Sequence, residues 1–194
     1  MSWGKFIATA GLFGAYIVKD TIPDEKIEIL RDNCNNLRDR AMIDFLLSTG
    51  IRVGELVRLN IDDIDFSERE CVVYGKGDKE RKAYFDAKTK IHLLNYIESR
   101  TDNNIALFVS LNKPHSRLTE SGVELRLREM GKKLGVEKVH PHKFRRTMAT
   151  RAIEKGMPIE QVQKILGHEQ IDTMLRYAMV NQNNVKLSHR KYIS

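Results

Sequence analysis

The segment PHKFRRT carries a histidine and an arginine, His142 and Arg145, at a spacing that suits phosphate binding. Pro141 favours the first position of a helix, and residues three apart on a helix lie on the same face. The free backbone N–H groups of a helix start attract anions, and a guanidinium binds phosphate oxygens in pairs. The segment is therefore a candidate phosphate site, although a basic helix start taken alone is more often a solvated surface.

A second candidate is the junction TGIRVGEL, in which Arg52 stands between Gly50 and Gly54. Glu55 can orient the Arg52 guanidinium through paired hydrogen bonds, although an Arg–Glu pair is also an ordinary surface feature. Lys76 lies in the sequence GKG, within an expected hairpin turn. A lysine in such a turn is ordinarily exposed and inert, so its position alone assigns it no role.

The third candidate is a histidine followed by a tyrosine nine residues later, His168 and Tyr177. Gly167 is expected to end a helix, which leaves His168 in the turn that follows. If residues 170–179 form the next helix, Tyr177 lies on its flank, off the apolar stripe. This position weakens the interpretation of Tyr177 as a core aromatic, although a half-buried tyrosine is common. The stripe itself consists of Ile171, Met174, Leu175 and Ala178.

The elements that would position these residues follow from helix signals and apolar spacing. Pro23 and the acidic pair after it start one helix, and apolar residues between 37 and 49 predict another that stops at Gly50. Short β-type runs at 64–66, 71–74 and 81–85, joined by turns at 67–70 and 75–80, predict an antiparallel sheet. Further helices are expected at about 53–59, 88–99, 119–134, 141–155, 158–166 and 170–179. The predicted fold class is mainly α with a small three-stranded antiparallel β-sheet (α+β).

The charge distribution points to a polyanionic partner. The 194-residue chain has a net charge of +7, and residues 113–155 hold 12 Lys and Arg against 5 Asp and Glu, so this segment accounts for the whole excess. A concentrated basic surface is typical of proteins that bind nucleic acid. A solvated basic face is an equally simple interpretation of the charge alone.

Cysteine content and hydropathy exclude several other classes. Cys34 and Cys71 are too few and too far apart for a disulfide framework or a zinc knuckle, which fits a reducing compartment. The apolar stretch at residues 6–18 is shorter than the roughly 20 residues that a membrane span needs. It also has no charged leader and no clear cleavage site. These features indicate a cytoplasmic protein.

In their order, these segments resemble the tyrosine recombinase family, which includes phage integrases, the integrases of mobile elements and chromosome-dimer resolvases. The matching segments are TGIRVGEL, YGKGDKER, PHKFRRT, LGH and the later tyrosine, and they cover residues 22–180. The resemblance implies the family's catalytic-domain fold and a site-specific recombinase or integrase that cuts and rejoins DNA through a 3′-phosphotyrosine intermediate. It implies that Tyr177 attacks the scissile phosphate and that Glu55 stands at the family's acidic position beside the first arginine. The groups implied to surround the phosphate are Arg52, Lys76, His142, Arg145 and His168.

The implied partners are double-stranded DNA, in a bacterial cytoplasm, and other copies of the chain, as a tetramer on paired DNA sites. No metal is expected, since arginine and lysine supply the positive charge that a metal provides elsewhere. No small-molecule cofactor and no membrane are expected either. The nearest carboxylate group, Asp62, Asp63 and Asp65, is interpreted as turn residues at a strand start. Within the basic segment, the expected DNA-binding residues are Lys113, Arg117, Arg126, Lys143 and Arg146.

Two features depart from the family's pattern. Ala178 and Met179 follow the tyrosine, where many members have a threonine and a histidine. Members also usually carry an N-terminal DNA-clamping domain of about one small domain's size, so we expect this chain to be the catalytic portion. We divide it into an appendage at residues 1–22, a catalytic domain at 23–180 and a tail at 181–194. A type IB topoisomerase and a non-cutting DNA-binding regulator of the same fold remain alternatives, which the compact size and the complete residue set disfavour.

Overall fold

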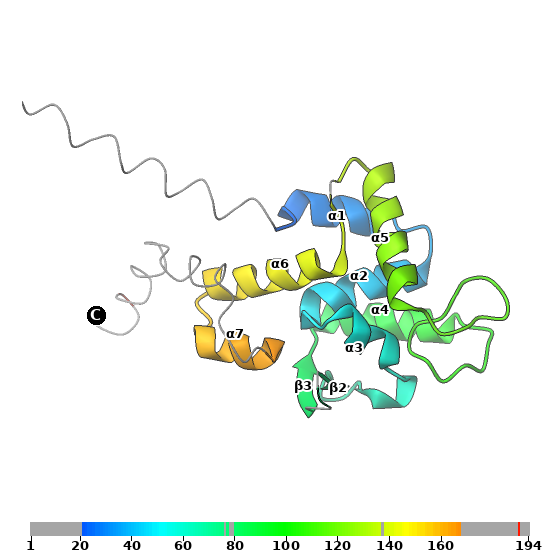
Figure 1. Ribbon diagram of the computed structural model, residues 1–194, viewed down its shortest axis with the longest axis horizontal. Coiled ribbons are helices and arrows are strands. Elements are labelled where there is room, and N and C mark those ends of the chain that lie inside the picture. The colour runs from blue at the N-terminus through cyan, green and yellow to red at the C-terminus, as the bar shows by residue number, and fades with distance from the viewer. Residues whose placement is uncertain (1–20, 76, 78–79, 137, 168–189, 191–194) are drawn as a thin grey trace, which may run out of the picture.

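The computed structural model describes residues 21–75, 77, 80–136, 138–167 and 190. Its elements form a group of packed helices with one small sheet at its edge (Figure 1). In chain order they are α1 (Asp24–Asp32), α2 (Leu37–Thr49), α3 (Val53–Arg58), the 3-10 helix η1 (Ile61–Asp63), β1 (Ile64–Asp65), β2 (Glu70–Tyr74), β3 (Glu80–Tyr84), α4 (Ala87–Glu98), α5 (Glu120–Lys133), α6 (Pro141–Glu154) and α7 (Ile159–Leu166).

The central helix is α2, which packs against both α4 and α6 and buries most of its side chains, including Phe45. Its start is capped by Asn36, whose side chain accepts a hydrogen bond from the backbone N–H of Asp39. It ends at Gly50, where φ is 61°, a left-handed conformation that glycine adopts without strain. Because Gly50 leads the chain directly into α3, the end of α2 fixes where Arg52 lies.

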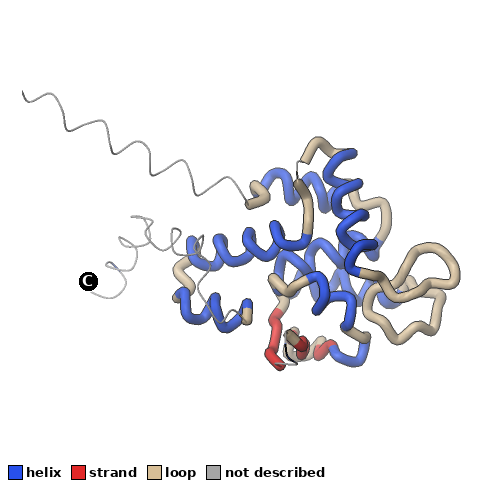
Figure 2. Tube along the Cα trace, viewed as in Figure 1, coloured by secondary structure: helices blue, strands red, loops and turns tan. Residues whose placement is uncertain are grey.

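The sheet has the order β1-β2-β3, and both pairs of neighbours are antiparallel. In Figure 2 it lies at one side of the helices. The register of β2 and β3 pairs Val73 with Arg81 and Tyr74 with Glu80, so residues 75–79 connect the two strands. Alternate side chains face the helices, and those buried on this inner face are Cys71, Val73 and Ala83.

The helix α6 connects two apolar clusters. Its first half contributes Phe144 to the main core, which also takes in residues from all the preceding helices. Its second half packs with α7 in a smaller cluster made of Ala149, Ile153, Ile159, Val162 and Leu166. The helix α6 therefore connects α7 to the main core, because it contributes side chains to both clusters.

The predicted fold class is confirmed, and each boundary predicted between residues 37 and 166 lies within one residue of the observed one. Residues 61–63 form a 3-10 helix rather than a simple turn, because the Asp63 carboxylate accepts the backbone N–H of Asn60 at 2.7 Å. Ile22, which we assigned to the N-terminal appendage, is buried and donates its N–H to Oγ1 of Thr147 at 2.9 Å. The helix predicted at 170–179 lies outside the described residues.

Within the part of the chain that the structure describes, no helix combines the length and apolar character needed to cross a membrane.

Candidate active site

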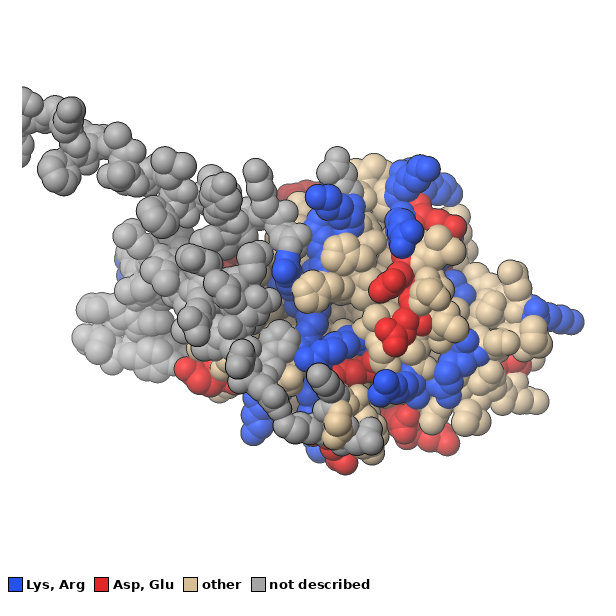
Figure 3. Space-filling model, viewed as in Figure 1, with Lys and Arg blue, Asp and Glu red and all other residues tan. Residues whose placement is uncertain are grey.

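A cavity of about 710 Å³ opens between α3, α5, the end of β2 and the start of α6. Four residues predicted from separate sequence segments line it together: Arg52, Glu55, His142 and Arg145. Figure 3 shows a band of Lys and Arg side chains across the middle of one face of the molecule, with a smaller acidic group beside it. The fold thus brings residues from two distant parts of the chain into one basic hollow.

Arg52 precedes the first turn of α3 and is held there by Glu55. Its backbone N–H donates to Oε2 of Glu55 at 2.8 Å, and its Nη1 donates to Oε1 at 3.0 Å. The Glu55 side chain is buried, whereas the Arg52 side chain is 44% exposed. Nη2 of Arg52 donates to the carbonyl of Gly167 at 3.3 Å. A buried carboxylate therefore holds one edge of a guanidinium that remains open to the cavity.

Arg145, in the first turns of α6, is almost fully buried and donates to two carbonyls. Its Nη1 donates to Gly50 O at 2.6 Å and its Nη2 to Leu166 O at 2.5 Å. Burial, with the nearby charge of Arg52, lowers the pKa of Arg145 to about 9, so the guanidinium stays charged at neutral pH. A phosphate in the cavity would offset both of these unfavourable influences.

A third arginine, which the sequence analysis did not select, lies beside Arg52 and Arg145, and the three form a cationic cluster. Arg81 of β3 donates from Nη2 to Oε2 of Glu55 at 2.6 Å and from Nη1 to the carbonyl of Ile165 at 2.8 Å. Strand alternation could have revealed it, since Arg81 shares the inner face of β3 with Ala83. A charged residue on a buried strand face needs a buried partner.

His140, immediately before α6, is a second residue that the sequence analysis missed. Its ring stacks on that of His142, with centroids 6.5 Å apart and planes 8° apart. Burial, together with the charges of His142 and Lys143, lowers the pKa of His140. His140 is therefore biased towards the neutral form, which can accept a proton or a hydrogen bond. The repeated histidine of HPH around Pro141 was the signal for it.

Lys76, His168 and Tyr177 lie outside the described residues. Their described neighbours nevertheless reach the site: Gly75 lines the cavity, and the Gly167 carbonyl accepts a hydrogen bond from Arg52.

The five predicted DNA-binding residues have different environments, and none is among the residues that line this cavity. Lys113 is exposed between α4 and α5. Arg117 donates to the carbonyls of Val57 and Leu59, both at 2.9 Å. Arg126 donates to the buried carboxylate of Asp39 at 2.7 Å. Lys143 is buried, and Arg146 is half-buried with interactions inside the protein.

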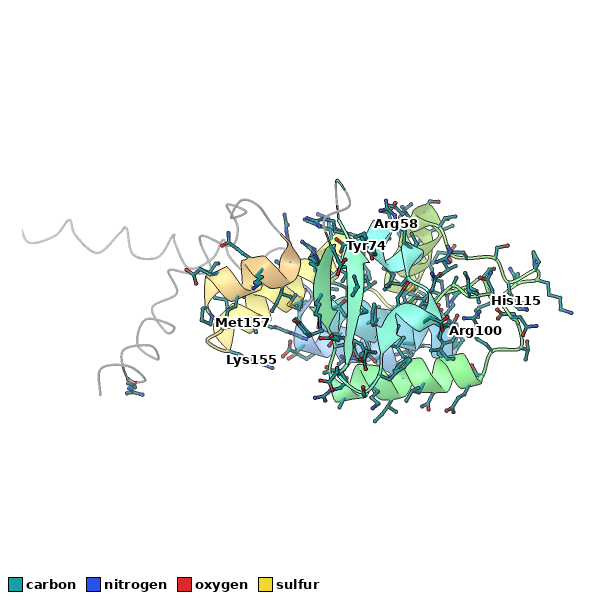
Figure 4. The ribbon with its side chains drawn as sticks, turned by 90° about the horizontal axis from the view of Figure 1, so that it is seen from below. Arg58, Tyr74, Arg100, His115, Lys155 and Met157 are labelled. Carbon is teal, nitrogen blue, oxygen red and sulfur yellow. The ribbon has the colours of Figure 1, made fainter. Side chains whose placement is uncertain are left out.

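Two other exposed arginines line the cavity instead, Arg58 of α3 and Arg128 of α5. In the view of Figure 4, Arg58 appears beside Tyr74, a cavity residue at the end of β2. No cluster of three or more His, Cys, Asp or Glu side chains among the described residues could hold a metal ion.

The chain belongs to the phage integrase family, whose model matches residues 21–184. The tyrosine recombinase XerC of Staphylococcus aureus is 36% identical over 173 residues, which are 84% of this chain and 57% of that protein. A crystal structure of XerA recombinase matches with a TM-score of 0.75 and 32% identity, over 90% of this chain and 64% of that one. XerH site-specific recombinase bound to its difH substrate, at 23% identity, a TM-score of 0.70 and coverage of 90% and 55%, has a similar fold. The predicted resemblance is therefore confirmed, and the chain spans little more than half the length of the curated relatives it matches.

Proposed function

We propose that this chain is the catalytic portion of a site-specific recombinase that cuts and rejoins double-stranded DNA through a 3′-phosphotyrosine. One observation carries the proposal: Arg52, just before α3, and Arg145 of α6 converge with Glu55 and His142 on a single cavity. The names and sequences of the relatives support it, since XerC is a tyrosine recombinase and covers most of this chain.

In the proposed reaction, Arg52 and Arg145 bind the two non-bridging oxygens of the scissile phosphate and stabilise the charge that develops there. The hydroxyl oxygen of Tyr177, whose ordinary pKa is about 10, attacks the phosphorus, and its proton passes to His142. The bond from phosphorus to the 5′ oxygen then breaks, and Lys76 gives that oxygen a proton. His168 donates a hydrogen bond to a phosphate oxygen.

The products are a 3′-phosphotyrosine ester and a free 5′ hydroxyl. The ester keeps the energy of the phosphodiester, so the 5′ hydroxyl of a second DNA end can reverse the reaction without ATP. Because arginine and lysine supply the positive charge, we expect cleavage to persist in excess EDTA. Loss of cleavage on chelation, with recovery on adding Mg²⁺, would contradict this mechanism.

The assembly and setting are parts of the same proposal. DNA is the proposed substrate, and the Tn1549 transposon integrase, which has a similar fold, is solved in complex with DNA. A tetramer on paired sites is the proposed active form. The proposed setting is the bacterial cytoplasm. Lys113, with Arg58 and Arg128 at the cavity, is proposed to contact the DNA backbone. Residues 23–180 are proposed to act as one catalytic unit, between the segments 1–22 and 181–194.

The test uses a library of nicked duplexes with randomised arms. The nick lies close to the position of cleavage, so the short strand that leaves with its 5′ hydroxyl diffuses away and the protein–DNA ester is trapped. Wild-type chain should give a denaturant-resistant adduct, and sequencing of the trapped DNA identifies a working substrate. Tyr177→Phe should give no adduct at nearly unchanged DNA affinity, whereas Tyr84→Phe, at an exposed tyrosine of β3, should behave as wild type.

The alternatives predict different results in this experiment. A wild-type chain that binds DNA without an adduct would be a DNA-binding regulator. An adduct accompanied by supercoil relaxation but never by exchange between two duplexes would indicate a topoisomerase. An adduct that survives in Tyr177→Phe would refute the assignment of the nucleophile.

A further inference from the structure

Three arginines converge on the C-terminal end of α7. Its last helical residues and the glycine that follows present consecutive carbonyls that accept no backbone N–H from the described part of the chain. They carry the negative end of the helix dipole and attract cations. Each carbonyl accepts a hydrogen bond from a different arginine: Ile165 from Arg81 at 2.8 Å, Leu166 from Arg145 at 2.5 Å, and Gly167 from Arg52 at 3.3 Å. The end of α7 is therefore a common anchor for the cationic cluster.

Arg81 differs from the other two arginines in this cluster. Arg52 and Arg145 line the cavity, whereas Arg81 is not among its lining residues and its side chain is only 12% exposed. Its guanidinium is held between Glu55 on α3 and Ile165 on α7. Arg81 is thus placed to act on a bound phosphate only through its neighbours.

The neighbour that matters is Glu55, whose two carboxylate oxygens have different partners. Oε1 accepts from the guanidinium of Arg52, whereas Oε2 accepts from the guanidinium of Arg81 and from the Arg52 backbone N–H. Carboxylates readily bind one guanidinium through both oxygens. Because Arg81 occupies Oε2, the Arg52 side chain forms a single bond to Glu55 and keeps donors free to face the cavity.

Arg81 also packs directly on the residue that ends α7. A Cβ on Gly167 would lie 2.7 Å from Cδ and from Nε of Arg81, so this contact requires glycine. One side chain therefore fixes both the Glu55 carboxylate and the end of α7.

A purely structural purpose explains Arg81 poorly. Burial and the charge of Arg52 lower the pKa of Arg81 although Glu55 raises it. A buried guanidinium beside two others is expensive to desolvate, and an apolar side chain of similar volume often stabilises a fold as well or better. The cost is understandable if the charge serves the reaction.

We propose that Arg81 is a positioning residue, which holds Oε2 of Glu55 and the end of α7 so that Arg52 is directed at the scissile phosphate. This inference rests on the proposed recombinase function.

The test compares Arg81→Lys with a control on the same strand, Lys82→Gln, whose side chain is exposed and paired with Glu70. The substrate is the nicked duplex recovered with the wild-type chain. Single-turnover adduct formation by Arg81→Lys should slow by about 100-fold, the cost of a small misplacement of a reacting group. DNA affinity, measured on the same variants carrying Tyr177→Phe, should stay within about threefold. Lys82→Gln should match the wild type in both measurements.

A second arm separates positioning from simple destabilisation. If Arg81 acts through Arg52, then Arg81→Lys should slow the reaction far less in an Arg52→Lys background, since residues that act as a unit are not additive. Equal slowing in both backgrounds would overturn the proposal. Slowing by Arg81→Lys that disappears when the assay is run well below the variant's melting temperature would also overturn it, because the slowing would then come from partial unfolding. A wild-type chain that forms no adduct would instead refute the recombinase function itself, and Arg81 would then have no reaction to position.

Discussion

Arg52 and Arg145 already have internal partners before any phosphate arrives, and those partners suit catalysis. Arg145 is held by two neutral carbonyls, and Arg52 by one carbonyl and one oxygen of Glu55. A phosphate oxygen is a charged acceptor, which makes a stronger hydrogen bond with a guanidinium than these neutral carbonyls do. The donors also need little rearrangement, which is the condition for strong electrostatic stabilisation of a transition state.

At the same scale, Lys76 should be the acid that protonates the leaving 5′ oxygen. An alkoxide leaves poorly, so this proton is worth roughly 10²–10⁴-fold in rate, whereas a thiolate, with a pKa of about 8.5, leaves without it. Lys76→Ala should therefore cleave ordinary DNA slowly and recover most of its rate on DNA with sulfur at the 5′ bridging position. Arg52→Ala should not recover, because Arg52 serves the non-bridging oxygens. Equal defects of Lys76→Ala on both substrates would show that Lys76 only binds phosphate.

Arg126 should matter for stability more than for DNA binding. It donates to Asp39, whose carboxylate is fully buried. Burial raises the pKa of Asp39, but hydrogen bonds and charge from Arg38, Asn36 and Arg126 lower it by more. The net pKa lies below the usual value, so the carboxylate is charged in the folded protein. Arg126→Ala should reduce the free energy of unfolding by about 1–3 kcal/mol, measured by urea denaturation.

The matched control is Arg128, two residues along α5, which is exposed and lines the cavity. Arg128→Ala should leave the unfolding free energy within about 0.5 kcal/mol of wild type and weaken DNA binding instead. If Arg126→Ala weakened DNA binding without destabilising the fold, the surface role that its sequence position suggested would be the better one.

Among the elements, the regular ones were predictable because each carries its own signals. The helix α2 has its cap at Asn36 and its stop at Gly50, and the register of β2 with β3 agrees with the expected hairpin. The segment 101–118 between α4 and α5 has no repeating apolar pattern. It is held by side chains that bind backbone carbonyls, such as Arg100 on Ala106 and Arg117 on Leu59, and such bonds leave no periodic signal.

Most of the candidate site was also predictable, because most of its residues carry local signals in the sequence. Arg52, Glu55, His142 and Arg145 stand in short motifs whose order is informative. Arg81 ends the segment YGKGDKER, but its role depends on its contact with Ile165 of α7, 84 residues later in the chain. That contact comes from the packing of α7 beside β3, and no local pattern reports it.

The end of α7 provides a prediction at the scale of elements. Gly167 has φ of 62°, and an added Cβ would also collide with Arg81. Gly167→Ala should therefore cost more than the roughly 1–2 kcal/mol of left-handed strain, measured as the free energy of unfolding, and should slow adduct formation by displacing Arg81. Gly135→Ala is the control, since its φ of 64° is similar but an added Cβ would meet nothing within 4 Å. Equal stability losses and normal cleavage in both variants would show that Gly167 does not hold Arg81 in place.

For the whole molecule, the excess charge is concentrated in one stretch of sequence but put to different uses in the fold. Residues 113–155 contain all of α5 and all of α6. Some of their basic groups, such as Arg117 and Arg126, hold parts of the protein together, and Arg145 lies at the candidate phosphate site. Others, such as Lys113 and Arg128, are exposed. Only the latter kind can exchange counterions for DNA phosphates without first breaking contacts inside the protein.

This division makes the salt dependence of DNA binding a measurable property of the molecule. Each phosphate that the protein neutralises contributes about −0.9 to the slope of log affinity against log salt. Three to five such contacts would reduce affinity by roughly 10²-fold between about 50 and 200 mM salt.

Lys113→Gln and Arg128→Gln should each make the slope shallower by about one, whereas Arg117→Gln should change stability and leave the slope alone. Lys88→Gln, an exposed lysine of α4 outside the cavity lining, is the control for net charge and should leave the slope unchanged. An equal reduction for all four variants would mean that net charge, rather than the placement of exposed basic groups, determines DNA binding.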